Sequence, residues 1–181
     1  MFSISRTKDP ATHSQKTETS GTTIRHPHLA RPTGPLHSIL NLMHTAARQL
    51  VLHGSIVLLF GLLLGGPYAK AIKRGAPPNI VNSWRVAHLS LPIGATLMLA
   101  VAALLPSMTV PTALDWVIAI AFIVSAYGFC VSTPLAALTG ERGLSSGGAG
   151  LGGLVYFGNW VGAVASIVGA AALVIAAFLS L

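Results

Sequence analysis

The fold is decided by residues 86–105, which read VAHLSLPIGATLMLAVAALL and contain no charged side chain. An α-helix needs about 20 predominantly apolar residues to cross the hydrocarbon core of a bilayer, so this stretch is long enough. Stretches of the same character lie at about 50–68, 114–138 and 154–181. Because backbone groups within lipid must be hydrogen-bonded inside the segment, we expect all four stretches to be transmembrane helices.

Turn-forming residues separate these stretches. The first connection is GAPPN at 75–79, the second lies between Pro106 and Pro111, and the third is the glycine-rich segment at 140–153. Glycine and proline interrupt helices and favour tight connections. The sequence therefore predicts an all-α integral membrane protein, an antiparallel four-helix bundle over residues 49–181 with both ends on one side. Lys and Arg near the helix ends are almost evenly divided between the two sides, so the orientation stays open.

The composition excludes a water-soluble protein. Of the 181 residues, 52% are hydrophobic and only 8% are charged, and the mean hydropathy is +0.71. In a soluble domain about 25% of the residues are charged. The net charge is +7, but the Lys and Arg residues form no basic stripe with interleaved aromatics, so no nucleic-acid partner is expected. The partner that this composition indicates is the lipid bilayer.

Residues 1–48 form a polar N-terminal tail. They carry eight of the fifteen charged residues, five of the seven histidines and several prolines. Such a segment buries too little apolar surface to offset the entropy lost on ordering, so most of it is expected to be disordered. Its weakly amphipathic part, at 36–48, is a candidate interfacial helix.

Small residues recur at the spacing that lets membrane helices pack closely. Gly61 and Gly65 lie four apart in the first predicted helix, and the fourth helix contains Gly158, Gly162 and Gly169. One interpretation is packing among the four helices of one chain. The other is an oligomer interface along the fourth helix.

Two histidines lie within the predicted spans, where an ionisable side chain is costly and indicates a functional site. For His53 the favoured interpretation is a hydrogen bond to a neighbouring helix. His53 and His88 each lie near the start of their own helix. Two histidines can ligate one haem iron from both sides only if they lie at the same depth. In antiparallel helices these positions are separated by about 20 Å of depth, from a rise of about 1.5 Å per residue, so one iron cannot bridge them. If His88 binds a haem, the iron keeps an open position, which suits a Lewis acid rather than an electron carrier.

Other polar residues in or beside the spans are candidates for a pocket. Trp84 and Arg85 flank His88, and Arg85 could pair with a haem propionate or extend to lipid headgroups. Asn159 could be a packing group or a hydrogen-bond donor in a pocket. Asp115 could cap the third helix. The hydroxyl groups in the spans could bond only to backbone carbonyls; they belong to Ser90, Ser125, Ser132 and Thr133. Pro92 and Pro134 could kink their helices and open a cavity.

Four short motifs resemble the styrene oxide isomerase family of small four-helix membrane enzymes. They are LHG at 52–54, WRVAH at 84–88, LLPS at 104–107 and RGL at 142–144, within a resemblance that covers roughly residues 48–181. The family has His-Gly at the start of the first helix and Trp-x-x-Ala-His at the start of the second. The resemblance implies a homotrimer that binds haem b. It places the iron on His88 as axial ligand, with Trp84 and Arg85 beside the cofactor.

The resemblance also implies a reaction, the Meinwald rearrangement of an apolar epoxide to a carbonyl compound, with ferric iron as the Lewis acid. The family carries a substrate-facing Asn, Asp and Tyr at positions that correspond to Gly94, Ser125 and Thr133 here, and none of the three matches. With Asn159 these residues are the pocket candidates, and they indicate a rebuilt substrate site for a different epoxide. The alternatives are a non-isomerising haem-binding membrane protein, either an electron carrier or a small-ligand sensor, and a structural four-helix protein without a cofactor.

Overall fold

The computed structural model of the protein describes residues 35–140 and 150–181, with side chains from residue 45 onward. Within these ranges all of the regular secondary structure is helical. Its elements are α1 (Pro35–Leu63), α2 (Gly65–Lys73), α3 (Pro78–Leu104), the short 3-10 helix η1 (Leu105–Ser107), α4 (Thr112–Thr139) and α5 (Leu151–Leu179). Residues 1–34 of the predicted tail and residues 141–149 lie outside the described residues.

Four helical segments are long and apolar enough to cross a membrane, which confirms the predicted fold class. They span Thr45–Lys73, Pro78–Ser107, Thr112–Thr139 and Leu151–Leu179. At most 33% of the most apolar window of each span is buried, so most apolar side chains face outward, where lipid or another protein chain can cover them. The protein is therefore a multi-pass integral membrane protein. The stretch at 36–48 belongs to α1 and runs without a break into the first span.

The first span contains two helices because proline interrupts its hydrogen bonding. Pro67 has no backbone N–H and cannot bond to the carbonyl four residues earlier, and the helix assignment breaks at Leu64. Backbone hydrogen bonds still cross the break, from Leu64 to Phe60 and from Tyr68 to Leu64. As a result, α2 continues the first span up to its basic end at Lys73.

Glycine and proline make the described connections as the sequence predicts. Gly75 adopts a φ of 63°, a left-handed conformation that lets the chain reverse after α2. Pro78 then occupies the first turn of α3, where a missing N–H costs nothing. Gly140, with a φ of 73°, ends α4 in the left-handed conformation that is common after helices.

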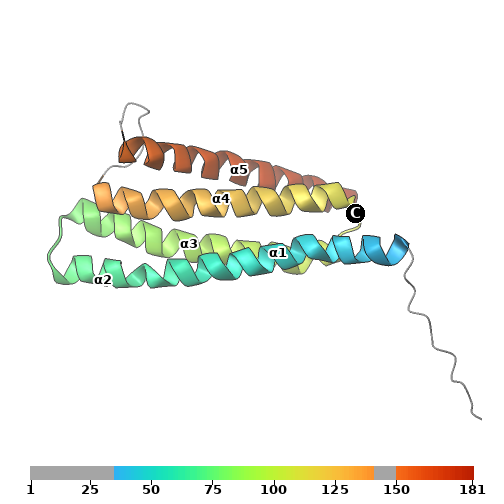
Figure 1. Cartoon of the computed structure of the whole chain (residues 1–181), viewed down its shortest axis with the longest axis horizontal. Coiled ribbons are helices and arrows are strands. Elements are labelled where there is room, and N and C mark those ends of the chain that lie inside the picture. The colour runs from blue at the N-terminus through green and yellow to red at the C-terminus, as the bar shows by residue number, and fades with distance from the viewer. Residues whose placement is uncertain (1–34, 141–149) are drawn as a thin grey trace, which may run out of the picture. The chain divides into compact units, whose positions relative to one another are not determined.

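The bundle is built around α4, which packs against α1, α3 and α5, while α1 also packs along α3. Among the described residues α5 makes no comparable contact with α1 or α3, so α4 lies between α3 and α5 and separates them (Figure 1). The start of α1 and the end of α5 lie at the same end of this bundle (Figure 1).

The glycines of α5 pack inside the chain. A Cβ on Gly158 would lie 3.0 Å from the Gly128 carbonyl oxygen of α4, and one on Gly162 would lie 3.0 Å from the Phe129 ring. Gly169 is likewise buried, against the Phe122 ring. Intramolecular packing is therefore the interpretation that the structure supports for these glycines, and they are not free to form an oligomer interface.

Both helix prolines lie inside continuous helices, Pro92 in α3 and Pro134 in α4. The Pro92 ring faces α1, where a Cβ on Gly61 would lie only 2.6 Å from the ring carbon Cδ. Gly61 thus provides the room for Pro92, and α1 and α3 approach closely at this level.

Candidate functional site

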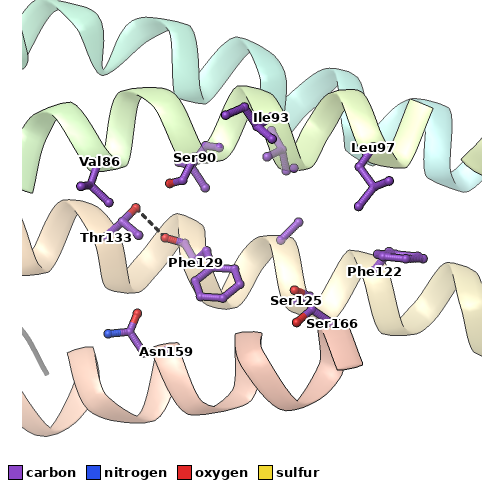
Figure 2. Close-up of a pocket in the computed structure, with 14 residues that line it drawn as sticks. Val86, Ser90, Ile93, Leu97, Phe122, Ser125, Phe129, Thr133, Asn159 and Ser166 are labelled. Carbon is purple, nitrogen blue, oxygen red and sulfur yellow. Dashed lines mark hydrogen bonds between the residues drawn. The ribbon is translucent and has the colours of Figure 1, made fainter. Parts of the chain in front are cut away.

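The main candidate site is a cavity of about 510 Å³ that lies between α3 and α5, with α4 at its base (Figure 2). Its lining is mostly apolar and includes the aromatic rings of Phe122 and Phe129. Ile93, at the rim, is 71% exposed, so the cavity opens toward the surroundings of the bundle. A volume of this size is typical of small-molecule sites. The lining residues are Val57, Val86, Ser90, Leu91, Ile93, Gly94, Leu97, Phe122, Ser125, Ala126, Phe129, Thr133, Asn159 and Ser166.

The structure brings all four predicted pocket residues into this one cavity. Gly94 comes from α3, Ser125 and Thr133 from α4, and Asn159 from α5. A Cβ on Gly94 would have nothing within 4 Å, so this position contributes open space. Their roles toward a substrate stay predictions.

Three hydroxyls in the cavity already donate to backbone carbonyls. Thr133 donates to the Phe129 oxygen of its own helix at 2.8 Å, as expected for a hydroxyl in a membrane helix, and Ser166 donates to Ala163 at 2.8 Å. Ser125 bonds instead across the interface, from its buried Oγ to the Gly162 oxygen of α5 at 2.8 Å. These hydroxyls can accept a hydrogen bond from a ligand, but their protons are already used.

Asn159 and Ser90 are the other polar residues of the cavity. Neither has a hydrogen-bond partner among the described residues. A second cavity of about 370 Å³ adjoins the first and shares Val86, Thr133 and Asn159 with it. It also contains Asn82 and Ser83 near the start of α3, so Asn159 stands where an apolar cavity meets a more polar one.

His88 lies on α3 against the first span. Its Nδ1 is 2.9 Å from the Gly61 carbonyl oxygen, and its ring is stacked with Tyr68 at 6.2 Å between centroids. A carbonyl oxygen only accepts, so Nδ1 carries the proton and donates, which leaves the lone pair of Nε2 available. A histidine that ligates a metal usually has this arrangement, with one ring nitrogen held by a backbone carbonyl. His88 is therefore suited to an axial position on a haem iron.

Glycine also keeps space beside the His88 ring. A Cβ on Gly65 would lie 3.1 Å from Cε1 of His88, so a larger residue there would push the ring away from its position.

Within one chain His88 does not face the cavity. Val86 and Ser90, two residues before and after it, both line the cavity. At 3.6 residues per turn, a residue two positions away points to roughly the opposite side of the helix. His88 and the four pocket residues thus lie on opposite sides of α3.

The two residues that flank His88 in the sequence differ in surroundings. Trp84, one turn earlier, is partly buried and packs against the apolar cluster between α1 and α3. Arg85 is exposed, and its guanidinium donates to Asn82 Oδ1 at 2.8 Å. Arg85 lines a hollow beside Tyr68, so its charge lies on the same side of the bundle as the His88 ring.

His53 has the helix-to-helix hydrogen bond that the sequence favours for it. Its Nδ1 lies 2.9 Å from the Tyr127 hydroxyl of α4, with the two rings edge to face. His88 is level with Gly61, eight residues after His53, so the depth that separates the histidines is about 12 Å rather than about 20 Å. The sequence estimate was too large because α3 starts at Pro78, which puts His88 deeper than expected. The two still face different helices and cannot ligate one iron.

Two buried polar residues lie outside the candidate site. Asp115 is only 3% exposed in the first turn of α4. The residue at the cap position is Pro111 and no side chain caps the helix there, so the expected capping role was wrong. Ser132 is fully buried against Gly158, and its Oγ has no hydrogen-bond partner. Among the described residues, no group of three or more His, Cys, Asp or Glu side chains could hold a metal.

Sequence reasoning missed the aromatic partners of both histidines. Tyr68 and Tyr127 lie on different elements from the histidines they contact, and no local spacing relates them. Ser166 was also missed, although it lies two helical turns after Asn159 on the same face of α5. That spacing was the one signal available.

Four apolar spans and a cavity that opens outward between three of them define a multi-pass membrane protein with room for an apolar small molecule. The family model described as styrene oxide isomerase matches residues 46–178. This match covers most of the chain, which therefore belongs to the styrene oxide isomerase family, and this membership supports an isomerase function in general. No curated protein and no solved structure matches the chain.

Proposed function

We propose that this protein is a haem-b-dependent membrane isomerase that converts an apolar epoxide to a carbonyl compound by the Meinwald rearrangement. Family membership supports the reaction class. The observation that carries the proposal is the apolar cavity, whose lining contains the three positions that the resemblance relates to substrate-facing residues, Gly94, Ser125 and Thr133. An epoxide from the bilayer could enter between α3 and α5 without crossing water.

His88 would hold the iron through Nε2, and Trp84 and Arg85 lie where they could flank the porphyrin. The Gly61 carbonyl accepts a hydrogen bond from Nδ1, so Nε2 is the ring nitrogen left to face the iron. The exposed Arg85 guanidinium is available for a carboxylate such as a propionate. When bound, ferric haem supplies a Lewis acid for the epoxide oxygen.

The cavity residues bind the substrate and keep water out. None of the lining residues is a carboxylate, histidine or lysine, so the cavity wall offers no general acid or base. The Meinwald rearrangement needs none, because one C–O bond opens, a hydride moves with its electron pair to the carbon left cationic, and the remaining C–O bond becomes C=O within the same molecule. A dry wall also prevents water from capturing the opened epoxide.

The positions of His88 and the cavity support an oligomer. They lie on opposite sides of α3, so one chain cannot present a haem on its own His88 to its own cavity. Two adjacent copies could do so if the His88 side of one chain faced the cavity of the next, and a closed ring repeats this contact. Together with the family resemblance, this geometry supports the homotrimer, which we expect to bind haem at the boundaries between protomers.

The trimer is tested by the mass of the detergent-solubilised protein. We expect native mass spectrometry to give three chains of 18.7 kDa with bound haem. Dissociation to monomers by harsher detergent should release the haem in parallel. A monomer that keeps a full complement of haem would contradict a site shared between protomers.

The proposed reaction is tested with the purified protein and a panel of epoxides of increasing size. The open space at Gly94 predicts that bulkier apolar epoxides react with a kcat/KM several-fold higher than that of styrene oxide, with the carbonyl product identified by gas chromatography. Glycidol, which is small and polar, is the matched control and should not react. A haem spectrum with two histidine ligands and no turnover across the panel would support the electron carrier instead. A protein without a haem spectrum would favour the structural interpretation.

A further inference from the structure

The polar groups of the cavity are distributed unevenly along it. Leu97 and Phe122 lie at one end, Ser125 and Ser166 lie between, and Asn159 and Thr133 lie at the end that adjoins the second, more polar cavity (Figure 2). Because Ser125 and Ser166 donate to backbone carbonyls, the free donors of the carboxamide lie at the Asn159 end. A ligand that matches this distribution has an elongated apolar body and one polar group at its end.

Asn159 is the polar side chain best able to recognise that group. Its carboxamide has two N–H donors, and among the described residues it has no hydrogen-bond partner. It is the ninth residue of α5, about 12 Å from the helix start at about 1.5 Å per residue. An amide at such depth is costly unless something bonds to it. Figure 2 shows Asn159 directed from α5 toward the part of the cavity lined by Thr133, with the carboxamide oxygen on that side and the nitrogen beside it. Rotation about the terminal bond exchanges the two, because this torsion is broad and roughly two-fold.

The hydroxyls are weaker candidates for the same role. Ser125, Thr133 and Ser166 donate their protons to backbone carbonyls, and an ether oxygen can only accept. Ser90 has a free hydroxyl, but it lies exposed at the rim of the cavity, where a ligand is held on fewer sides. Only Asn159 combines free donors with a partly buried position.

We propose that the Asn159 carboxamide is the specificity-determining group of the cavity, and that it donates a hydrogen bond to the oxygen of an elongated apolar epoxide whose body lies beside Gly94. The identity of the oxygen group rests on the proposed function; the position of the donor does not. In this chain the amide stands on α5, while the corresponding space on α3 is left open by glycine. The cavity therefore keeps a polar anchor and gains length.

Binding of two unreactive ligands tests this inference without turnover. One is a fluorinated biphenyl oxetane, whose ether oxygen accepts a hydrogen bond but whose ring resists opening. The other is the matching cyclobutane, which has CH₂ in place of the oxygen. Affinities for the protein in nanodiscs are measured by fluorine NMR, with protein-free nanodiscs correcting for partition into lipid. We expect at least about 5- to 10-fold tighter binding of the oxetane, the contribution of one neutral hydrogen bond.

Three variants then locate the interaction. Asn159→Leu should lower the affinity ratio by about 5- to 10-fold by weakening the oxetane alone, because leucine keeps the volume and removes the donor. Ser90→Ala, which removes the other free polar group, should leave the ratio unchanged. Gly94→Leu should weaken both ligands by filling the space for the body.

Several results would overturn the inference. These are a ratio near 1 in the wild-type protein, a ratio that survives Asn159→Leu, loss of the ratio in Ser90→Ala, or unchanged binding of both ligands in Gly94→Leu. If the binding results hold while no epoxide is isomerised, the proposed function fails and the role of Asn159 stands. If epoxides are isomerised but Asn159→Leu leaves the affinity ratio unchanged, the proposed function stands and the role of Asn159 fails.

Discussion

We expect His88→Ala to purify without the haem absorption band that the proposed cofactor would give the wild-type protein. The variant loses the only histidine of the described residues whose free ring nitrogen is backed by a backbone carbonyl, Gly61, on the other nitrogen. Even removing an outer hydrogen bond from a metal-ligating histidine costs 10- to 100-fold in affinity. We therefore expect the loss of the ligand itself to lower haem affinity by roughly 100-fold or more. The measurement is haem content per chain, from the absorption spectrum and the pyridine haemochrome assay.

His53→Ala is the matched control for this experiment. His53 is the other histidine in the described spans, but its partner is the Tyr127 hydroxyl on α4. Its removal should leave most of the haem in place and cost about 1 kcal/mol of stability, which is typical of one lost hydrogen bond. Loss of the absorption band in His53→Ala, or its retention in a correctly assembled His88→Ala protein, would show that His88 is not the ligand.

The four spans could be predicted from sequence because hydropathy and length are local properties. A run such as 86–105 must be helical in lipid whatever its neighbours are. The ends of the helices were less predictable. The second span, α3, begins at Pro78, eight residues before the apolar run at 86–105, because polar residues at the membrane surface continue a helix as readily as apolar ones. His88 thereby lies deeper than the sequence indicates.

The pocket residues could be predicted individually, but their arrangement could not. Polar residues in a membrane span are exceptional, so Ser125, Thr133 and Asn159 stand out from the sequence alone. That they line one cavity depends on α5 packing against α4 and scarcely against α3. No residue spacing encodes that choice. The same holds for His88, since its direction relative to the cavity is known only once α1 is placed on the opposite side of α3.

The second large effect is expected at Gly61, because this residue packs closely against α3 and its carbonyl oxygen accepts the hydrogen bond of His88. A Cβ at Gly61 would lie 2.6 Å from Cδ and 3.0 Å from Cγ of the rigid Pro92 ring, and 2.9 Å from Cβ of Leu91. Neither neighbour can rotate away, so Gly61→Ala must separate the two helices. Overpacking of this kind costs about 1–3 kcal/mol. We expect the melting temperature of the solubilised protein to fall by about 5 °C, since about 1 kcal/mol shifts it by about 2–4 °C at this size.

Gly66→Ala, only five residues away, is the matched control: it makes the same substitution in the first span at a position without close packing. A Cβ at Gly66 would have nothing within 4 Å, and alanine favours a helix over glycine by up to about 1 kcal/mol. This variant should be as stable as the wild-type protein or more so. Haem content adds a second measurement, because a shift of α1 also moves the Gly61 carbonyl away from His88 Nδ1. Gly61→Ala should therefore lose haem while Gly66→Ala keeps it. Equal melting temperatures and equal haem content in the two variants would mean that α1 and α3 do not approach as closely as the structure shows.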